Sequence, residues 1–500
     1  MTGLIGLVLI PLLASPAVYL LGRLYCRRMN PGGACALGRW LGFAVLMATW
    51  LPYIQTLMEF QAHGTLKFTL GLVSLRADGI SLLMAAVVLT LSTLVMLYSG
   101  PYVAGEHNEE KYYAMLVAMS GAMIGLSMAS DLFNLWVWFE TMAITSYLLV
   151  AFYRDLPHAL EAGVKYMLQS ATGSALVLFG IALVLAQTGT LDLAKIRATA
   201  DGGTLLLAAG ALFVVGFGVK AALVPLHTWL PDAHSQAPSG ISALLSGVVI
   251  EAGLLALLRS VAALAGVTST WGVLLMALGA INMLMGNLMA LRQTQVKRML
   301  AYSSLSHVGY MLLGLGIAFY AGQSDGAQGS LFHLLNHGLM KGLAFLAAGA
   351  LLYSLHAVSG DHAPLVIGDL SGAAQRYPWV ALTLSIALLG LGGMPPLAGF
   401  MSKWQIFTAG FGTHNGWIMA LVIFAAFNSV LSLGYYAPLV NAMYRRQPSA
   451  VMAQGKNVPW SMMLPLLLLA AAVIVLGFYP ALLNNLTQPA GAALMQILGG

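Results

Sequence analysis

Charged residues are scarce in this sequence. Asp, Glu, Lys and Arg make up 8% of its 500 residues, whereas soluble domains average about 25%. Because so few charges cannot cover a soluble surface and 59% of the residues are hydrophobic, most of the surface is expected to face lipid. The composition excludes disordered, collagen-like and coiled-coil proteins. The net charge of +6 is spread over loop residues, without the basic patch that would bind nucleic acid.

Cysteine is also nearly absent. Cys26 and Cys35 lie beside a basic loop, allow at most one disulfide and form no metal or haem motif. The sequence lacks a Gly-rich phosphate loop, an iron–sulfur cluster motif and a haem attachment motif. The loops are too short for a soluble catalytic domain. We therefore predict no catalytic, cofactor-binding or metal-binding residues, and a function carried out inside the bilayer.

Long apolar runs are abundant. They are continuous over about 20 residues, the length of a transmembrane helix, and lack the alternation of an outer-membrane barrel. About fourteen spans are predicted, and they begin near Leu4, Leu41, Ile80, Tyr113, Leu132, Ala159, Leu205, Ile241, Gly272, Leu300, Leu331, Trp379, Trp417 and Met462. The first has no basic leader and is predicted to be a retained helix. A last stretch, 481–498, is interrupted by Asn, Pro and Gly and is predicted to lie at the membrane interface.

Basic residues fall mainly in the odd-numbered loops. They are Arg23, Arg27, Arg28 and Arg39 after the first span, Arg154 after the fifth, Arg292, Lys297 and Arg298 after the ninth, and Arg445, Arg446 and Lys456 after the thirteenth. The positive-inside rule places these loops in the cytoplasm and both termini outside. The third loop is mostly acidic, but acidic residues count little in this rule.

Ionisable residues inside the apolar runs are the candidates for function, because each costs about 3 kcal/mol at the bilayer centre. The predicted proton relay consists of Glu140, Lys165, Lys220, Glu251, His307, His333, His337, Lys341 and Lys403. Snorkelling or a structural ion pair explains a single charge of this kind. Proton movement requires a chain of titratable groups through an apolar bundle, and the sequence supplies one.

A spacing repeats between the two halves. Lys165 is matched by Lys341, 176 positions later, and each has an ionisable residue four positions earlier on the same helix face. Lys220 is matched by Lys403, 183 positions later, and each adjoins a span interrupted by Gly and Pro. Interrupted spans at corresponding places indicate a repeat-built transporter with its ion site at the broken helices. Because the members of each pair are an odd number of spans apart, the repeats are predicted to be inverted.

The sequences of the interrupted spans resemble those of a known protein family. The segment KAALVPLHTWLPDAHSQAP, 220–238, resembles the signature of the antiporter-like subunits of respiratory complex I, Mrp-type cation/proton antiporters and membrane-bound hydrogenases. VKRMLAYSSLSHVGYMLLGLG, LFHLLNHGLMKGLAFLAAGAL and GMPPLAGFMSKW, with the stretches around Glu140 and Lys165, extend the resemblance over roughly 78–446. It implies an all-α polytopic membrane protein of fourteen helices, with broken helices seven and twelve, that translocates ions without a bound redox cofactor.

The resemblance also implies a division of the chain. It comprises an N-terminal three-helix segment, 1–110, two inverted five-helix repeats, 111–266 and 271–446, and a C-terminal helix and tail, 447–500.

The resemblance implies roles for single residues. Glu140 matches the glutamate of the fifth helix, and Lys220 and Lys403 match the lysines of the seventh and twelfth. In the eighth helix, where the family usually has lysine, this chain has Glu251. Glu251 either accepts a proton, clamps Lys220 in a salt bridge or forms a fixed structural pair.

Polar residues and prolines gather where the helices are expected to break. The prolines free backbone carbonyls for water or ions, and the histidines lack zinc-site spacing, so gating or structural hydrogen bonds are predicted. The predicted gating residues are Pro225, His227, Pro231, Asp232, His234, Pro395 and Pro396.

The predicted function is proton translocation in a multisubunit redox complex, complex I-like or hydrogenase-like, of a bacterial or archaeal cytoplasmic membrane. Burial favours a neutral Lys220, whereas a nearby Glu140 carboxylate favours the charged form, so separating the two releases a proton. Because the chain has no energy source, we expect further antiporter-like membrane subunits and peripheral redox subunits carrying iron–sulfur, flavin or nickel–iron groups. The alternatives are a gradient-driven Mrp-type Na⁺/H⁺ antiporter subunit and a proton-coupled subunit for inorganic-carbon uptake.

Overall fold

Helices fill most of the chain, because a bilayer offers no water to an open backbone and a helix satisfies its own amides. The computed structural model describes residues 2–28, 36–71, 73–359, 363–445 and 447–498. Arg446 and Cys35, and with Cys35 the one disulfide that the sequence allows, lie outside the described residues.

The first half contains helices and one β-hairpin. Its helices are α1 (Thr2–Arg28), α2 (Ala36–His63), α3 (Gly79–Tyr102), α4 (Glu109–Met128), α5 (Leu132–Val150), α6 (Pro157–Thr188), α7 (Leu193–Thr199), α8 (Thr204–Lys220), α9 (Trp229–Gln236), α10 (Ser239–Leu244), the π-helical turn Leu245–Val249 and α11 (Ile250–Ala263). The hairpin pairs β1 (Leu66–Leu70) with β2 (Val73–Ala77) in antiparallel register.

The second half is helical in its described part. Its helices are α12 (Trp271–Leu291), α13 (Val296–Ala321), α14 (Ser324–Ser359), the 3-10 turn Ile367–Leu370, α15 (Ala373–Arg376), α16 (Pro378–Gly392), α17 (Ala398–Phe411), α18 (Gly416–Met443), α19 (Ala450–Gln454), α20 (Trp460–Phe478), the 3-10 turn Pro480–Leu483 and α21 (Asn484–Leu498).

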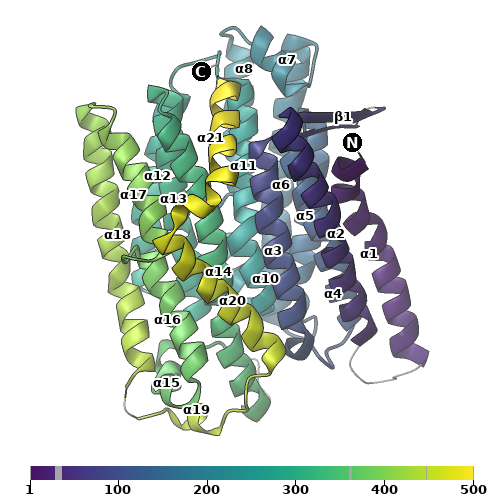
Figure 1. Cartoon of the computed structure of the whole chain (residues 1–500), viewed down its shortest axis with the longest axis vertical. Coiled ribbons are helices and arrows are strands. Elements are labelled where there is room, and N and C mark those ends of the chain that lie inside the picture. Colours follow the sequence, from purple (N-terminus) through teal and green to yellow (C-terminus); the bar gives the residue numbers. More distant parts are fainter. Residues whose placement is uncertain (1, 29–35, 72, 360–362, 446, 499–500) are drawn as a thin grey trace.

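The helices form an upright bundle, with both chain ends, the hairpin and α7 at one end and α15 and α19 at the other (Figure 1). Within the described chain, ten helices are long and apolar enough to cross a membrane. Every predicted span start falls inside a helix. The prediction of a polytopic all-α membrane protein is thus confirmed, while the total of fourteen crossings, the inverted repeats and the domain boundaries stay predictions.

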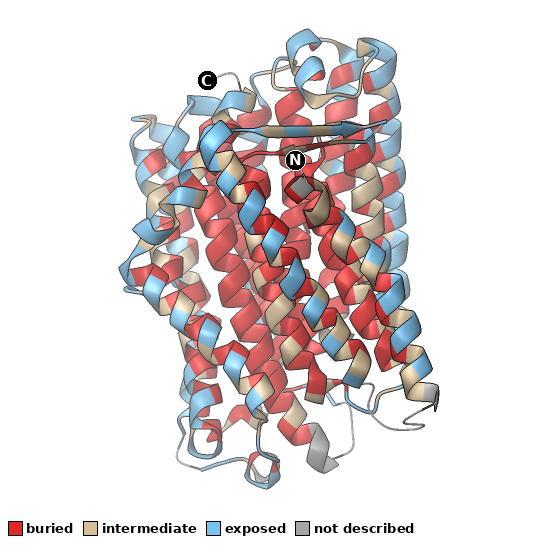
Figure 2. Ribbon diagram, turned by 45° about the vertical axis from the view of Figure 1, so that its right-hand side comes forward, coloured by how far each residue is buried: buried red, intermediate tan, exposed pale blue. Residues whose placement is uncertain are grey.

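The core runs through the middle of the bundle. Figure 2 shows the central helices buried along their length, whereas exposed residues follow the outer helices and both ends. The segment from α10 to α11 is buried throughout, and α14 nearly so. These central helices carry many of the ionisable residues, so packing removes those groups from both lipid and water.

Two helices break where Gly and Pro predicted it. α8 ends at Lys220 and α9 begins at Trp229, while α16 ends at Gly392 and α17 begins at Ala398. Each break contains a cis X-Pro bond, Val224–Pro225 and Pro395–Pro396.

Asparagines from neighbouring helices bind the backbone groups that the breaks leave free. In the first break, the Asn282 side chain accepts from Val224 N at 2.9 Å and donates to the Ala222 carbonyl at 3.3 Å. At the second break, Asn336 Nδ2 donates to the Ala398 carbonyl at 3.0 Å. Asparagine side chains therefore bind some of the backbone groups at the breaks that were predicted to be free for water or ions.

Asp78 caps the start of α3 through a capping box with Ser81. It also accepts from Arg259 of α11 at 2.9 and 3.2 Å, and Arg76 lies 3.4 Å away. Burial by itself raises the pKa of Asp78, but the Arg259 and Arg76 charges and these hydrogen bonds hold that pKa below its usual value. The lowered pKa means that Asp78 stabilises the fold at neutral pH, and that this contribution is lost as the pH falls through the lowered value.

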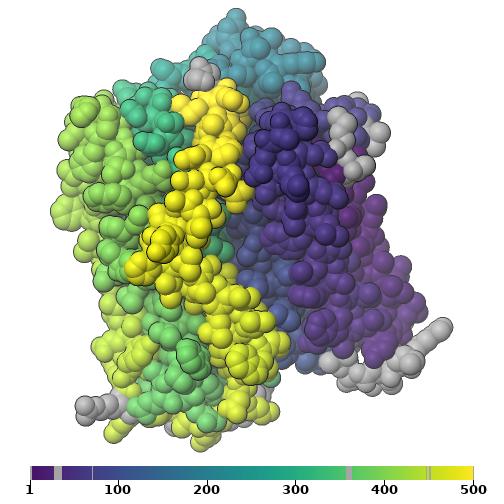
Figure 3. Space-filling model, viewed as in Figure 1, coloured from purple at the N-terminus to yellow at the C-terminus, as the bar shows by residue number. Residues whose placement is uncertain are grey.

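The C-terminal helix α21 crosses one face of the molecule (Figure 3). It packs against α3 and α14, and a Cβ at Gly79 would lie 2.3 Å from the Pro489 carbonyl carbon. The stretch predicted to lie at the interface is therefore held against the bundle along its length.

Glycines hold α12 and α13 close together. A Cβ at Gly279 would lie 2.8 Å from the Gly309 carbonyl oxygen, and one at Gly309 would lie 2.6 Å from that of Gly279. A Cβ at Gly272 would likewise lie 2.8 Å from the Gly316 carbonyl oxygen. We call this contact the glycine seam. Small residues of this kind let membrane helices approach backbone to backbone.

Candidate functional site

The predicted lysines of the two broken helices are buried. Lys220 ends α8 and is 0% exposed, and Lys403 lies on α17 and is 2% exposed. Glu251 on α11 and Lys341 on α14 are also 0% exposed. Because buried charges are costly without partners, the groups around each of them decide what it can do.

Lys220 is bound by hydroxyl groups. Its Nζ donates to Tyr166 Oη at 2.6 Å and to Ser146 Oγ and Ser170 Oγ, both at 3.3 Å. The Tyr166 ring stacks on Trp229 at 3.9 Å between centroids. Trp229 Nε1 donates to the Val219 carbonyl at 2.7 Å, which ties the start of α9 to the end of α8.

Glu140 is not in contact with this lysine. It makes no ion pair within the described parts of the chain, and its buried Oε1 has no hydrogen-bond partner. The neighbouring Phe139 ring lies 5.9 Å from Lys220 Nζ. The predicted pair is therefore adjacent but separated, which is the arrangement expected to favour release of a proton.

Glu251 contacts the second half of the chain. Its Oε1 lies 2.8 Å from His337 Nδ1, while its buried Oε2 has no hydrogen-bond partner. The salt bridge to Lys220 that the sequence left open is therefore not formed. The α11 helix still packs on Lys220, because a Cβ at Gly253 would lie 2.9 Å from Lys220 Cβ.

The three predicted histidines form one cluster. His307 and His337 lie 5.0 Å apart between ring centroids, and His307 Nδ1 is 3.0 Å from His333 Nε2. His333 Nδ1 is 2.8 Å from Ser402 Oγ. Since Ser402 directly precedes Lys403, Glu251 and the histidines form a row that leads to the second broken helix.

The remaining two buried lysines lie beside this row. Lys403 Nζ donates to the Leu391 carbonyl and to Ser429 Oγ, both at 2.9 Å, and lies 4.6 Å from the Tyr310 ring centroid. Lys341 donates to the Leu300 carbonyl at 2.7 Å and to Ser303.

Lys165 lies elsewhere, on the outer surface of α6. Its side chain is 50% exposed, with Glu161 Oε1 at 2.7 Å and Asp232 Oδ2 at 3.2 Å. Asp232, a predicted gating residue, also pairs with Arg298 at 2.6 Å. Asp232 therefore links α9 to α6 and α13 and fixes the helix that follows the first break.

One buried lysine is absent from the predicted relay. The sequence predicts a cytoplasmic loop position for Lys297, but it lies within α13, is 6% exposed and donates to the Ala237 carbonyl at 2.5 Å. The predicted gating residue His234 is buried against the Phe345 ring, with both ring nitrogens unpartnered. The one sequence signal for Lys297 is its place three residues before the predicted span that begins near Leu300.

The other predicted gating residues line the breaks. His227 is 8% exposed, and its ring lies 6.3 Å from that of Tyr302. Pro225 precedes it in the first break, Pro231 lies in α9, and Pro395 and Pro396 lie in the second break. Among the described residues, no three His, Cys, Asp or Glu side chains are grouped so that they could hold a metal ion.

Comparison with known families agrees with this geometry. Residues 129–432 match the family described as NADH:quinone oxidoreductase/Mrp antiporter, TM. Residues 63–113 match the family described as NADH-Ubiquinone oxidoreductase (complex I), chain 5 N-terminus.

Single proteins match over most of the chain. NADH-quinone oxidoreductase subunit N 2 of Roseiflexus castenholzii is 36% identical, covering 75% of this chain and 76% of that protein. F(420)H(2) dehydrogenase subunit N of Methanosarcina mazei is 32% identical, covering 91% and 93%. Hydrogenase-4 component B of Escherichia coli is 34% identical over 79% of this chain and 60% of that protein.

Solved structures share the fold. A chain of the membrane-bound sulfane sulfur reductase, an archaeal respiratory membrane complex, superposes with a TM-score of 0.87 at 29% identity, covering 98% of this chain and 97% of that one. A chain of the Mrp complex from Dietzia sp. superposes with a TM-score of 0.86 at 22% identity, covering all of both chains, which shows the fold alone.

Proposed function

Since this chain belongs to the NADH:quinone oxidoreductase/Mrp antiporter family of membrane subunits, we propose that it moves protons along its buried row of ionisable side chains. The observation that carries the proposal is the row of side chains from Glu251 through the histidines to Ser402, beside Lys403. His337 and His307 meet through their rings, and the other neighbours in the row lie at hydrogen-bond distance. Intramembrane ionisable groups that lie in contact with one another are characteristic of proton relays.

The proposed transfer begins at Lys220. Its hydroxyl partners accept hydrogen bonds from the charged form, and the separated Glu140 gives it no contact with a carboxylate. A shift that brings Glu140 closer would favour the protonated lysine, and a shift away would release the proton. No side-chain hydrogen bond joins Lys220 to Glu251 in the described chain, so this step needs water.

From Glu251 the proton would pass to His337 and along the histidines. Each neutral imidazole has one nitrogen that donates and one that accepts, so the contacts at 2.8 and 3.0 Å suit proton exchange. Lys403, held by Ser429 and the Leu391 carbonyl, would be the last acceptor before the exit. Lys341, beside the row, would disfavour a second proton there whenever it is itself protonated.

An outside source of free energy has to drive this transfer, because moving one charge against 100 mV costs about 2.3 kcal/mol. We propose that partner subunits supply it, and that any redox cofactors are bound there. The relatives are named as subunits of NADH-quinone oxidoreductase, F(420)H(2) dehydrogenase and hydrogenase-4, which supports redox partners. We also propose that the termini lie outside, with the Arg-rich loops in the cytoplasm.

A gradient-driven Na⁺/H⁺ exchange is the second candidate, and the description of the matching family, which names the Mrp antiporter, supports it. Co-purification from the native membrane distinguishes the two. Iron–sulfur or flavin subunits identified by mass spectrometry would support redox drive, whereas small membrane subunits alone would support exchange. Uptake of inorganic carbon stays an expectation from the sequence.

The test of proton movement is Lys220→Met in the assembled complex, reconstituted in vesicles with a pH-sensitive dye. Coupled proton movement is expected to be lost while the complex still assembles, because methionine keeps the side-chain length without the titratable group. Lys456→Met, which removes an exposed loop charge, is the matched control. Normal pumping by Lys220→Met would refute the proposal.

A further inference from the structure

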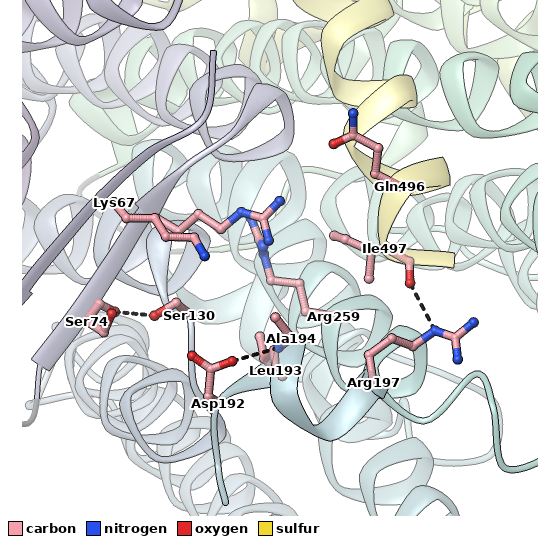
Figure 4. A pocket seen from close by; sticks show the side chains of 11 residues that line it. Lys67, Ser74, Ser130, Asp192, Leu193, Ala194, Arg197, Arg259, Gln496 and Ile497 are labelled. Atoms are coloured by element: carbon pink, nitrogen blue, oxygen red, sulfur yellow. Dashed lines mark hydrogen bonds between the residues drawn. The ribbon is translucent and has the colours of Figure 1, made fainter. Parts of the chain in front are cut away.

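A basic cavity lies at the end of the bundle that carries the chain termini. It has a volume of about 250 Å³, several times the ~30 Å³ that a water molecule takes up in the liquid. The hairpin, α7, α11 and α21 surround it (Figure 4). Its basic lining residues are Lys67, Arg76, Arg197 and Arg259. None of them belongs to the proton row.

Positive charge exceeds negative charge in this cavity. Asp192 is the one carboxylate among its lining residues in the described chain, and its Oδ1 accepts from the backbone of α7. Asp78, behind the cavity, binds Arg259. Four basic side chains thus face two carboxylates, both already engaged. This excess occurs in the loops where the positive-inside rule predicts few basic residues.

The hairpin adds to this excess in an unfavourable way. Lys67 lies directly opposite Arg76 in the β-ladder, so both side chains project from the same face. Like charges directly opposite each other destabilise a strand pair. An anion bound between the two side chains would attract both of them and offset this repulsion.

Unpartnered polar groups also indicate a ligand. Arg259 is 3% exposed, and its buried Nε has no hydrogen-bond partner among the described residues. Lys67 is exposed and makes no hydrogen bond or ion pair with any residue that the structure describes, so its ammonium is free to turn toward a ligand. Figure 4 shows Lys67 and Arg259 reaching toward the same space, with Asp192 and Leu193 along its edge.

We propose that this cavity binds a phosphate group. Guanidinium forks and an ammonium are the donors that phosphate oxygens prefer, and Ser74 and Ser130 add hydroxyls. Leu193 and Ile497 line the same cavity, which suits a phosphate attached to an apolar body. The phosphate can come from an anionic phospholipid head group or from a free phosphate ion.

The test is thermal unfolding of the purified full chain in mild detergent. The probes are short-chain phosphatidylglycerol and inorganic phosphate, each titrated at constant ionic strength. We expect a saturable rise in unfolding temperature, because a ligand that binds only the folded state stabilises it. Phosphatidylglycerol alone raising it assigns a lipid head group, and both probes raising it assigns phosphate without need of the lipid.

Lys67→Gln separates a site from general charge effects. Because the exposed Lys67 side chain has no hydrogen bond or ion pair to lose among the described residues, the variant is expected to fold normally. It is expected to need at least about tenfold more probe for half of the stability shift. Lys195→Gln is the matched control, since Lys195 lies on α7, is exposed and does not line the cavity. It is expected to respond like the unmodified chain.

Two results would overturn the proposal. One is an absence of saturable stabilisation by either phosphate probe, which would leave an acidic segment of a partner subunit as the occupant. The other is an equal response of Lys67→Gln and Lys195→Gln. If Lys67→Gln is poorly folded, Arg197→Gln with the same control gives the same comparison.

Discussion

The lysines at the two broken helices, Lys220 and Lys403, have different surroundings. At the first break, Lys220 is surrounded by three hydroxyls, and Glu140 is not in contact with it. At the second, Lys403 follows Ser402, which contacts the row of histidines. Both lysines lie over a tyrosine ring, Tyr166 at 4.3 Å and Tyr310 at 4.6 Å.

The difference indicates a division of labour. The first site holds a proton on one isolated group, so its transfer depends on water or on movement of Glu140. The second site is already connected by side chains in contact. Within that row, only the step from His337 to His307 lacks a hydrogen bond, since His337 Nε2 has no partner among the described residues. We infer that control of proton entry to the row lies in the first half and conduction in the second.

Glu251→Gln is expected to have the largest effect, because Glu251 is where the two halves meet. Glutamine keeps a hydrogen bond to His337 but takes up no proton, so proton transfer should fall by about 100-fold. Vesicle proton uptake measures it. Glu251→Asp, which retains the carboxyl group, is the control. Unchanged transfer in Glu251→Gln would make its pairing with His337 purely structural.

Tyr166→Phe and Tyr310→Phe test the two lysine sites directly. Tyr166 Oη accepts from Lys220 at 2.6 Å, and losing a hydrogen bond to a charged group costs about 1.5–3 kcal/mol. Proton transfer is therefore expected to change by at least about tenfold in Tyr166→Phe. The Tyr310 hydroxyl donates to the Ala425 carbonyl instead, so Tyr310→Phe should change transfer far less. Equal effects would contradict the comparison.

Asn282→Ala and Asn336→Ala compare the backbone at the breaks. Asn282 binds two groups of the first break and also donates to the Leu305 carbonyl at 3.4 Å, whereas Asn336 binds one carbonyl. Each buried group left unsatisfied costs about 1–3 kcal/mol, so the unfolding temperature should fall further in Asn282→Ala. An equal or reversed order would show that water replaces Asn282.

Lys165→Gln is expected to have the smallest effect on stability. Its ion pairs are half exposed, and exposed pairs contribute little, so the unfolding temperature should stay near that of the unmodified chain. The sequence spacing matches Lys165 with Lys341. Lys341→Gln should lower the unfolding temperature, because it alters a buried site. A large effect of Lys165→Gln would give Lys165 a structural importance that its exposure does not indicate.

The sequence predicted the features that local chemistry decides. Apolar runs of membrane length predicted the helices, and Gly and Pro predicted both breaks. These features depend on neighbours in the chain, which the sequence displays.

Features that depend on neighbours in space were beyond it. Lys165 and Lys341 have the same local spacing, yet one is 50% and the other 0% exposed, because α6 lies outside and α14 at the centre. The sequence left three roles open for Glu251, and its contact with His337 depends on how the two halves pack. The basic-residue pattern predicts a loop position for Lys297, because the sequence does not show how α13 packs.

The glycine seam gives the bundle a mechanical property. Because the glycines let α12 and α13 approach backbone to backbone along the seam, the two helices have little room to slide and should move as one rigid body. This body touches the first break through Asn282, and through Asn287 it holds Asn428, next to the Ser429 that binds Lys403. A displacement of the backbone at one break would therefore be transmitted to the other by rigid-body movement of α12 and α13. This coupling would not require a proton to pass between the two breaks.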